Sequence, residues 1–324
     1  MVMSQTLAAF TADEAKNAKV LLATQVASMM GRKLEEGDWN SVYSKAKNIP
    51  DAGWSNLHID INYAGLGVEQ KLLRCAGLNG KPLKSVCGTA LMHPAATRSI
   101  RIDNTGLPAE QVMQDVFRQY SELIDSRTNT VAKSANGKKP DMRIGWLIWE
   151  DTLSEFLYFE EPMNKPDAKK YRAEWNETPA RVVRKASKSL WIYDKTTGQK
   201  RYSVTTSAGI KIQPYFDVPP PSDPNLYYFR VQSEPVGNNI IHMWITHSTA
   251  RALEGRIGAL TLENVSKTAL AIAEDFEAEG QTATVEAELA VAVPISVAAH
   301  KRIVATIEAV SDEHRAQLML RALS

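Results

Sequence analysis

The chain has 324 residues, of which 44% are hydrophobic and 23% charged, and its formal net charge is +1. This length fits one large domain or two ordinary ones, and the composition is that of a soluble globular protein with enough apolar residues for a sizeable core. The balanced charge excludes a basic field over the whole molecule, although a DNA enzyme needs only a local positive cleft.

The cysteine content and the distribution of apolar residues indicate the cellular compartment. Cys75 and Cys87 are the only cysteines, which argues against a disulfide-built secreted scaffold. The amino end lacks a basic flank followed by an apolar core, and no apolar stretch approaches the length needed to span a bilayer. We therefore expect a cytoplasmic protein with no membrane partner.

The first predicted elements are two helices. Thr11 and Glu14 form a capping-box pattern that opens a helix over about 12–34. A second helix is expected over about 39–47 and stops before Pro50. After this helix, apolar and polar residues begin to alternate with a period of two.

Residues 58–71 predict a β-hairpin, because apolar and polar residues alternate on both sides of the turn Ala64-Gly65-Leu66-Gly67. Asp60 and Asn62 share one face of the first strand with His58, and Glu69 and Lys71 share a face of the second. If Asn62 pairs with Glu69, then Asp60 lies opposite Lys71 and diagonal to Glu69. The hairpin therefore predicts two carboxylates and an ammonium group at one place.

Such a group suits a hard divalent cation. Mg²⁺ prefers one or two carboxylates together with water and phosphate oxygens, and a nearby lysine can orient an attacking water. We therefore expect Asp60 and Glu69 to bind Mg²⁺ and Lys71 to position or polarise the nucleophile.

The pattern of Asp60, Glu69 and Lys71 resembles the PD-(D/E)xK nucleases. The run Gly67-Val68-Glu69-Gln70-Lys71 is most similar to the branch that contains the mismatch-repair nickase MutH and the Sau3AI-type restriction enzymes. Ile59, not proline, precedes Asp60, and the literal pair Pro50-Asp51 makes Asp51 a rival for the first acid. In several branches of the family the preceding helix supplies a further acid, for which Glu35 and Glu36 are the nearest candidates.

The resemblance implies a restriction-endonuclease-like mixed-sheet α/β core and a Mg²⁺-dependent endonuclease that hydrolyses double-stranded DNA as part of a restriction system. Two alternatives stay open: a DNA-binding protein of the same fold that does not cut, and an interaction or scaffold protein. In the last case Glu69 and Lys71 form an ordinary surface ion pair, worth about 0–1 kcal/mol.

Basic residues after the hairpin are candidate phosphate contacts. The first group is Arg74, Lys81, Lys84, Arg98 and Arg101. A second group lies in a segment over about 181–202 that interleaves basic residues with aromatic ones, and there we expect Arg184 and Lys188 to contact DNA.

The other expected elements follow in order. Residues 83–91 suggest a third strand of the hairpin sheet, 108–127 an amphipathic helix, 142–149 and 155–160 a strand pair, and 190–194 with 200–206 another hairpin. Residues 226–232 and 240–246 suggest a further strand pair, and the tail is expected to be largely helical. We predict a catalytic core over 1–178 and a β-rich, then helical, region over 179–324 for DNA recognition or homodimerisation.

Overall fold

The computed structural model describes residues 6–29, 34–50, 59–75, 81–86, 90–92, 95–96, 100–150, 153–180, 186–206, 211–232, 234–272 and 290–308. Within these ranges the protein is a mixed α/β structure with six α-helices and three sheets. It divides into two compact units that are interleaved in sequence. The first unit comprises Met1–Ala9, Ala52–Ile148 and Leu157–Tyr228, and the second Phe10–Asp51, Trp149–Phe156 and Phe229–Ser324.

Most of a five-stranded sheet belongs to the first unit. Its strands are β1 (Ile61–Tyr63), β2 (Leu66–Arg74), β5 (Asp141–Trp149), β6 (Glu155–Pro162) and β11 (Tyr227–Arg230), in that spatial order. The expected hairpin and the expected strand pair are both confirmed. Strands β2 and β5 run parallel, because both begin where the Asp141 N–H donates to the Gly65 carbonyl. The sheet is therefore mixed. In chain order, α3 (Ala109–Ala132) lies between the parallel strands β2 and β5.

The second sheet of the first unit is antiparallel. Its order is β3 (Ala90–Met92), β10 (Lys211–Asp217), β9 (Lys200–Thr205), β8 (Ser187–Asp194) and β7 (Tyr171–Thr178), and β4 (Ala95–Ala96) also pairs with β10. The expectation of a third hairpin-sheet strand over 83–91 is wrong. Leu83–Val86 form a 3-10 helix, and β3 pairs with β10 instead.

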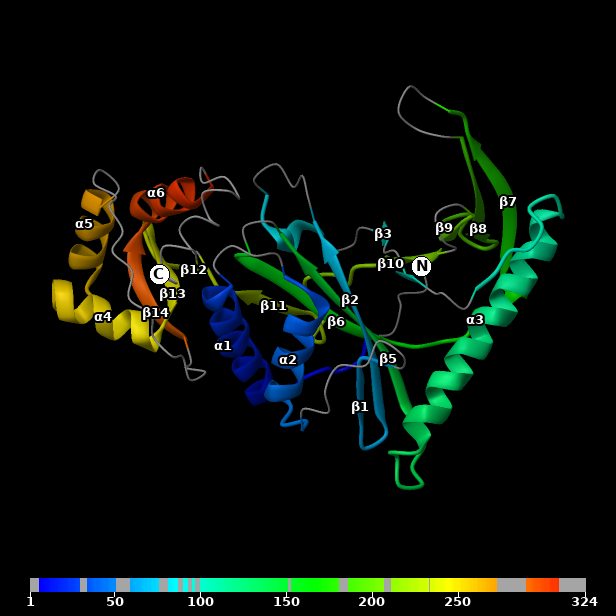
Figure 1. The fold of residues 1–324 in the computed structure, drawn as a ribbon, viewed down its shortest axis with the longest axis horizontal. Helices are drawn as coiled ribbons and strands as arrows, with labels where there is room; N and C mark the ends of the chain where they lie inside the picture. Colours follow the sequence, from blue (N-terminus) through cyan, green and yellow to red (C-terminus); the bar gives the residue numbers. More distant parts are fainter. Residues whose placement is uncertain are drawn as a thin grey trace, which may run out of the picture. The chain divides into compact units, whose positions relative to one another are not determined.

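Helix α3 packs on both sheets of the first unit (Figure 1). In its amino-terminal half, Val112, Val116 and Phe117 pack against buried residues of the antiparallel sheet. In its carboxyl-terminal half, Ile124 and Val131 form a core cluster with Ile59 and Met163. At about 1.5 Å per residue, the 24 residues of α3 span about 36 Å, enough to reach from one sheet to the other.

A buried polar network lies inside the five-stranded sheet. The Glu160 side chain is fully buried; its Oε2 accepts from Arg143 Nη1 at 2.8 Å and its Oε1 from the Tyr158 hydroxyl at 2.7 Å. The same hydroxyl lies 3.2 Å from Gln70 Oε1. A Cβ atom on Gly145 would lie 2.3 Å from that Gln70 oxygen, so glycine is required there for close approach of the strands.

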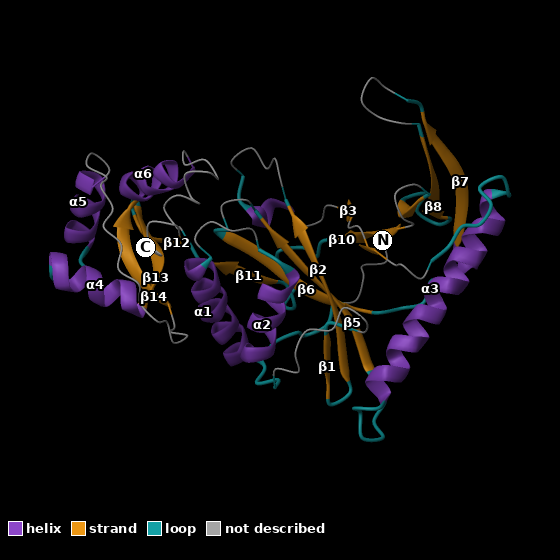
Figure 2. Ribbon diagram, in the orientation of Figure 1, coloured by secondary structure: helices purple, strands orange, loops and turns teal. Residues whose placement is uncertain are grey.

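The second unit is built around the sheet β12 (Glu234–Gly237), β13 (Ile240–Thr246) and β14 (Ala290–Ser296). Helix α1 (Ala12–Ser28), with α2 (Glu36–Ala46) beside it, covers one face; α4 (His247–Ile257), α5 (Leu262–Ile272) and α6 (Val297–Glu308) pack on the sheet from the other side (Figure 2). The expected pairing of 226–232 with 240–246 is wrong, because β11 pairs with β6 and β13 with β12 and β14.

Two further expectations bear on the organisation of the chain. The boundary expected between residues 178 and 179 falls between β7 and β8, which are paired along their whole length within the first unit. In the described ranges, no helix combines the length and the apolar character that crossing a membrane would require.

Candidate functional site

The β1–β2 hairpin turns more tightly than its sequence suggested. Asn62 pairs with Gly67 and Tyr63 with Leu66, so the turn consists of Ala64 and Gly65, both with positive φ (49° and 88°). These angles define a type I′ turn, whose twist matches that of the flanking strands. The expected pairing of Asn62 with Glu69 is therefore wrong by two residues, but a shift of two keeps every side chain on its expected face.

The turn gives a prediction for stability. Ala64 is exposed and adopts the left-handed conformation, which costs an L-residue about 1–2 kcal/mol. Asparagine tolerates this conformation, and Asn-Gly is the preferred type I′ pair. We expect Ala64→Asn to stabilise the protein by about 1 kcal/mol in thermal denaturation, and Ala64→Val to destabilise it. A lower melting temperature for Ala64→Asn would contradict the assigned turn.

Glu69 and Lys71 come together as expected. Lys71 Nζ lies 2.8 Å from Glu69 Oε1, and the two side chains are only 15% and 13% exposed. A second cation completes the pair, because Arg127 Nη1 of α3 lies 3.1 Å from Glu69 Oε2. Both carboxylate oxygens of Glu69 therefore contact cations beneath α3, which is not the geometry of an ordinary solvated ion pair.

Asp60 directly precedes β1, the strand that pairs with β2. Continuing the observed register places Asp60 opposite Glu69 rather than opposite Lys71. Its Oδ2 accepts a hydrogen bond of 2.7 Å from the backbone N–H of Gln70, which fixes the carboxylate beside β2. We define Asp60, Glu69, Lys71 and Arg127 as the acid–base cluster; at neutral pH the formal charges of these four side chains cancel.

Helix α3 positions this cluster. The Ser134 hydroxyl, just past the end of α3, donates to Asn62 Oδ1 at 2.8 Å, and its oxygen accepts from Gly65 N–H at 3.3 Å. Two turns before Arg127 on the same helix, burial raises the pKa of Tyr120 above its ordinary value, while the positive charge of Arg127 acts to lower it. The hairpin turn is thus held at one end of α3, and the charged side chains of β2 lie against its middle.

The donor set of the cluster fits a hard cation. Asp60 and Glu69 supply carboxylate oxygens from adjacent strands, as Mg²⁺ prefers, and no soft ligand is present in the cluster. In the described ranges no group of three or more histidine, cysteine, aspartate or glutamate side chains is placed to bind a metal, so a cation here would rely on two carboxylates and water. Coordination by Glu69 would also require the cations on its oxygens to move.

The accessory acids belong to another part of the fold. Glu35 and Glu36 lie in the second unit, where Glu35 precedes α2 and its N–H donates to Asp38 Oδ2 at 2.9 Å. Their assignment as accessory acids stays a prediction. Asp51, the rival first acid, lies outside the described residues.

The candidate DNA-contacting residues have different environments. Arg74, Lys81, Lys84 and Arg101 are exposed in the first unit, and Lys84 Nζ lies 5.9 Å from the centre of the Tyr228 ring. Arg98 and Arg184 lie outside the described residues.

Lys188 is engaged within the protein rather than presented on an open surface. Its Nζ donates to the Thr105 carbonyl at 2.9 Å and lies 4.7 Å from the centre of the Trp175 ring. Its assignment as a DNA contact therefore has little support from the geometry.

The residue that the sequence did not reveal is Arg127. It lies seven residues after Tyr120 and three after Ile124, so it falls on the buried side of α3. A basic residue at such a position is a signal that a buried carboxylate lies opposite. The helix was expected to end at this residue, and the continuation to Ala132 brings it inside the helix.

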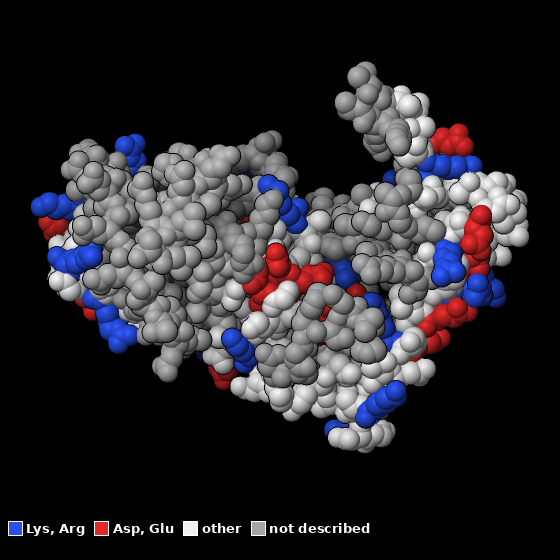
Figure 3. Space-filling view, in the orientation of Figure 1, with Lys and Arg blue, Asp and Glu red and all other residues white. Residues whose placement is uncertain are grey.

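On the face drawn in Figure 3, acidic and basic side chains are interspersed along α3. Arg118 illustrates this pattern, since it pairs with Asp115 at 2.6 Å and Glu122 at 2.7 Å. Such exposed pairs contribute little to stability and do not form a basic track for a phosphate backbone.

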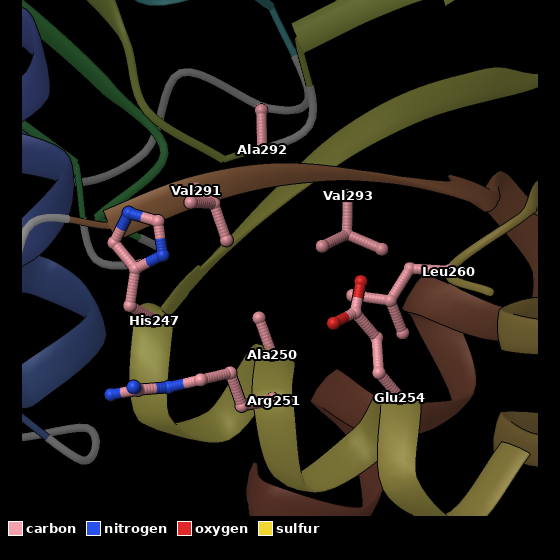
Figure 4. A pocket seen from close by; sticks show the side chains of 8 residues that line it. All are labelled: His247, Ala250, Arg251, Glu254, Leu260, Val291, Ala292 and Val293. Atoms are coloured by element: carbon pink, nitrogen blue, oxygen red, sulfur yellow. The ribbon is translucent and has the colours of Figure 1, made fainter. Parts of the chain in front are cut away.

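The second unit contains a cavity of about 300 Å³ between α4 and β14 (Figure 4). Val291 and Val293 contribute apolar side chains, and His247, Arg251 and Glu254 contribute polar ones from successive turns of α4. None of the residues expected to form the metal site lines this cavity.

Comparisons of the sequence with profiles of known protein families and with characterised proteins, and of the fold with solved structures, gave no match. The functional argument therefore depends on the geometry of the acid–base cluster.

Proposed function

We propose that the protein is a Mg²⁺-dependent endonuclease of the PD-(D/E)xK type that hydrolyses double-stranded DNA, with the acid–base cluster as its active site. The observation that carries the proposal is the pairing of Glu69 with Lys71 on β2, beside the carboxylate of Asp60 on the neighbouring strand. Strand β2 holds Glu69 and Lys71, and the hydrogen bond from the Gln70 N–H holds Asp60 beside them, so all three groups have fixed positions, as a phosphodiesterase site requires.

The topology supports a restriction-endonuclease-like core. The strand that bears Glu69 and Lys71 is the second strand of a mixed sheet, and α3 lies in the connection to its parallel neighbour β5. The order expected from the family resemblance was helix, hairpin, strand, helix and strand pair. The hairpin, the helix α3 and the strand pair follow that order in the first unit, whereas the strand after the hairpin belongs to the antiparallel sheet.

The proposed roles follow from position and charge. Asp60 and Glu69 would hold Mg²⁺, which when bound acidifies water and stabilises negative charge on the phosphate. Lys71 holds its ammonium group beside Glu69, where it can orient the attacking water. Arg127 adds a second positive charge, suited to a phosphate oxygen once it leaves Glu69.

The direct test is incubation of the purified protein with supercoiled plasmid, with Mg²⁺ and with EDTA. Conversion to open-circular or linear DNA only in the presence of Mg²⁺ is the expected result. Intact plasmid in both reactions, across several plasmid sequences and methylation states, would contradict the proposal.

A DNA-binding protein that does not cut is the second candidate, and one observation favours it. Both oxygens of Glu69 contact cations, so the charge that Mg²⁺ would neutralise is already neutralised by Lys71 and Arg127. Plasmid retention without cleavage would select this alternative.

Arg127 provides a way to test the metal site without DNA. Arg127→Ala removes a positive charge from Glu69 Oε2, so we expect Mn²⁺ to bind roughly tenfold more tightly, equivalent to about 1.4 kcal/mol. Titration calorimetry or the electron paramagnetic resonance signal of free Mn²⁺ measures this affinity. Arg118→Ala on the exposed face of α3 is the matched control, and equal Mn²⁺ affinity in all three proteins would show that Glu69 does not bind the metal.

A further inference from the structure

The face of the antiparallel sheet that points away from α3 carries partly exposed aromatic side chains. Leu190, Ile192 and Val204 are buried in the core that this sheet forms with α3. Because side chains alternate along a strand, Trp191 and Tyr193 of β8 lie on the opposite face. Tyr215 joins them from β10, one residue away from the buried Phe216, and all three aromatic residues are partly exposed.

Cations lie against these rings. Lys200 Nζ is 3.7 Å from the centre of the Trp191 ring and 5.1 Å from that of Tyr215. On β7, the Arg172 guanidinium lies 4.5 Å from the centre of the Tyr193 ring. We define Arg172, Trp191, Tyr193, Lys200 and Tyr215 as the aromatic–basic face.

The acids on the same side of the sheet are paired. Glu174 Oε2 lies 3.4 Å from Arg172 Nη1, and Asp217 Oδ2 lies 2.9 Å from Arg201 Nη1. With each acid matched by an arginine, the described side chains of this face carry one excess positive charge, that of Lys200. Burial, followed by the hydrogen bond to Glu174, raises the pKa of Tyr193 to about 12, so its phenol is neutral at physiological pH.

We propose that the aromatic–basic face binds single-stranded nucleic acid, with unpaired bases stacked on Trp191, Tyr193 and Tyr215 and phosphates bound by Lys200 and Arg172. Aromatic rings on a strand pair offer a stacking surface to any base, and adjacent cations match the backbone charge. A base-paired duplex does not present its base faces to such a surface, so unpaired strands are the partner that fits.

Stacking can displace the cations that lie on the rings. An exposed cation–π contact is worth about two- to fivefold in an equilibrium constant, whereas stacking of one base on an aromatic side chain is worth about 5- to 150-fold in affinity. The stronger contact therefore replaces the weaker one, and the displaced ammonium of Lys200 becomes available to a phosphate. An aromatic ring such as Trp191 thus binds a base while Lys200 binds a phosphate, so the two side chains do not compete for the same group of the ligand.

This inference does not depend on the proposed nuclease activity, and its test is separate. Fluorescein-labelled oligo(dT) and oligo(rU) of 15 nucleotides, and a 15-base-pair duplex, are titrated with the full-length protein in EDTA, where metal-dependent cleavage cannot occur. Fluorescence anisotropy reports binding at several salt concentrations.

We expect the single strands to bind at least tenfold more tightly than the duplex. Trp191→Ser and Tyr193→Ser should each weaken single-strand binding by about tenfold, while Trp191→Phe retains most of it. Lys200→Ala should lower the slope of log affinity against log salt by about 0.7. Arg118→Ala, which removes the same charge from the exposed side of α3, should leave the slope unchanged.

Circular dichroism and thermal denaturation confirm that each variant is folded before it is interpreted. Tighter binding of oligo(dT) or of oligo(rU) decides between a DNA and an RNA ligand, and either result supports the proposal. Preference for the duplex, or equal binding by Trp191→Ser, Trp191→Phe and the unmodified protein, would overturn it. An equal loss of slope in Lys200→Ala and Arg118→Ala would also overturn it, because it would indicate nonspecific charge attraction.

Discussion

Replacing Lys71 by methionine is expected to reduce plasmid cleavage by about 100- to 1000-fold while leaving DNA binding nearly unchanged. Lys71 is 15% exposed and lies 2.8 Å from Glu69 Oε1, so its ammonium group is held inside the acid–base cluster rather than in solvent. Methionine keeps the length and apolar body of the side chain but removes the charge that would orient the attacking water. The loss should therefore appear in the rate of the chemical step.

The cleavage rate is measured by single-turnover reactions on plasmid DNA, and binding by electrophoretic mobility in Ca²⁺. Lys138→Met is the matched control, because Lys138 is an exposed lysine in the same unit. Glu69→Gln should show a loss similar to that of Lys71→Met. Undiminished cleavage by both cluster variants would refute the assignment of the site.

The largest expected effect on stability follows from Arg143. Its Nη1 donates to the fully buried Glu160 and its Nη2 to Asp141, and Arg143 itself is only 17% exposed. Burial works to lower the pKa of Arg143, but the hydrogen bonds to Asp141 and Glu160 outweigh it and raise the pKa above its ordinary value. The guanidinium is thus stabilised in its charged form by the carboxylates that it neutralises.

Arg143→Met leaves Glu160 as a buried charge with one neutral partner, the Tyr158 hydroxyl. Loss of one member of a buried ion pair costs about 3–5 kcal/mol, and we expect a destabilisation of that size in thermal and urea denaturation. Replacing both residues, as Arg143→Met with Glu160→Met, should recover much of the loss because no uncompensated charge remains.

Arg118→Met is the control for this experiment. Arg118 is 60% exposed and also pairs with two acids, so its removal should cost less than about 1 kcal/mol. If Arg143→Met is as stable as Arg118→Met, or if the double variant is less stable than Arg143→Met alone, the buried pair does not have the role described.

Elements with a strong local pattern were predictable from the sequence. The alternation around Asp60 and Glu69 gives the faces of the β1–β2 hairpin correctly, because the period of two survives the shift in register. The tight turn was missed because Ala64 is not a residue that signals a left-handed conformation. The core stripe of α3 also follows from its spacing, through Val112 and Val116.

Elements that depend on distant partners were not predictable in this way. Strand β7, which pairs with β8 along eight residues, was missed although Tyr171, Ala173 and Trp175 alternate with polar residues. Strand β10, which joins β9 to β3, contains Pro214 and has no such alternation. Strand pairing across long chain separations is decided by tertiary packing rather than local propensity. The same reason explains why β11 joined β6 instead of the strand that follows it in the chain.

In the candidate site, too, some contacts follow from the local sequence and others depend on distant parts of the chain. Glu69 and Lys71 share a strand face two residues apart, so their contact follows directly from the pleat. Arg127 reaches Glu69 only because α3 crosses the hairpin sheet, a fact that no local pattern contains. Lys188 was selected for its place among basic and aromatic residues, but the β8 pleat directs it to Thr105, whereas Trp191 and Tyr193 lie on the opposite face.

The most direct test of the acid–base cluster is a crystal structure grown with Mn²⁺, in which anomalous scattering locates the metal. The account predicts a peak between the Asp60 and Glu69 carboxylates, with oxygen distances of about 2.0–2.3 Å and the Arg127 guanidinium moved off Glu69 Oε2. A metal bound elsewhere at saturating Mn²⁺, with Glu69 still paired to Lys71 and Arg127, would contradict it.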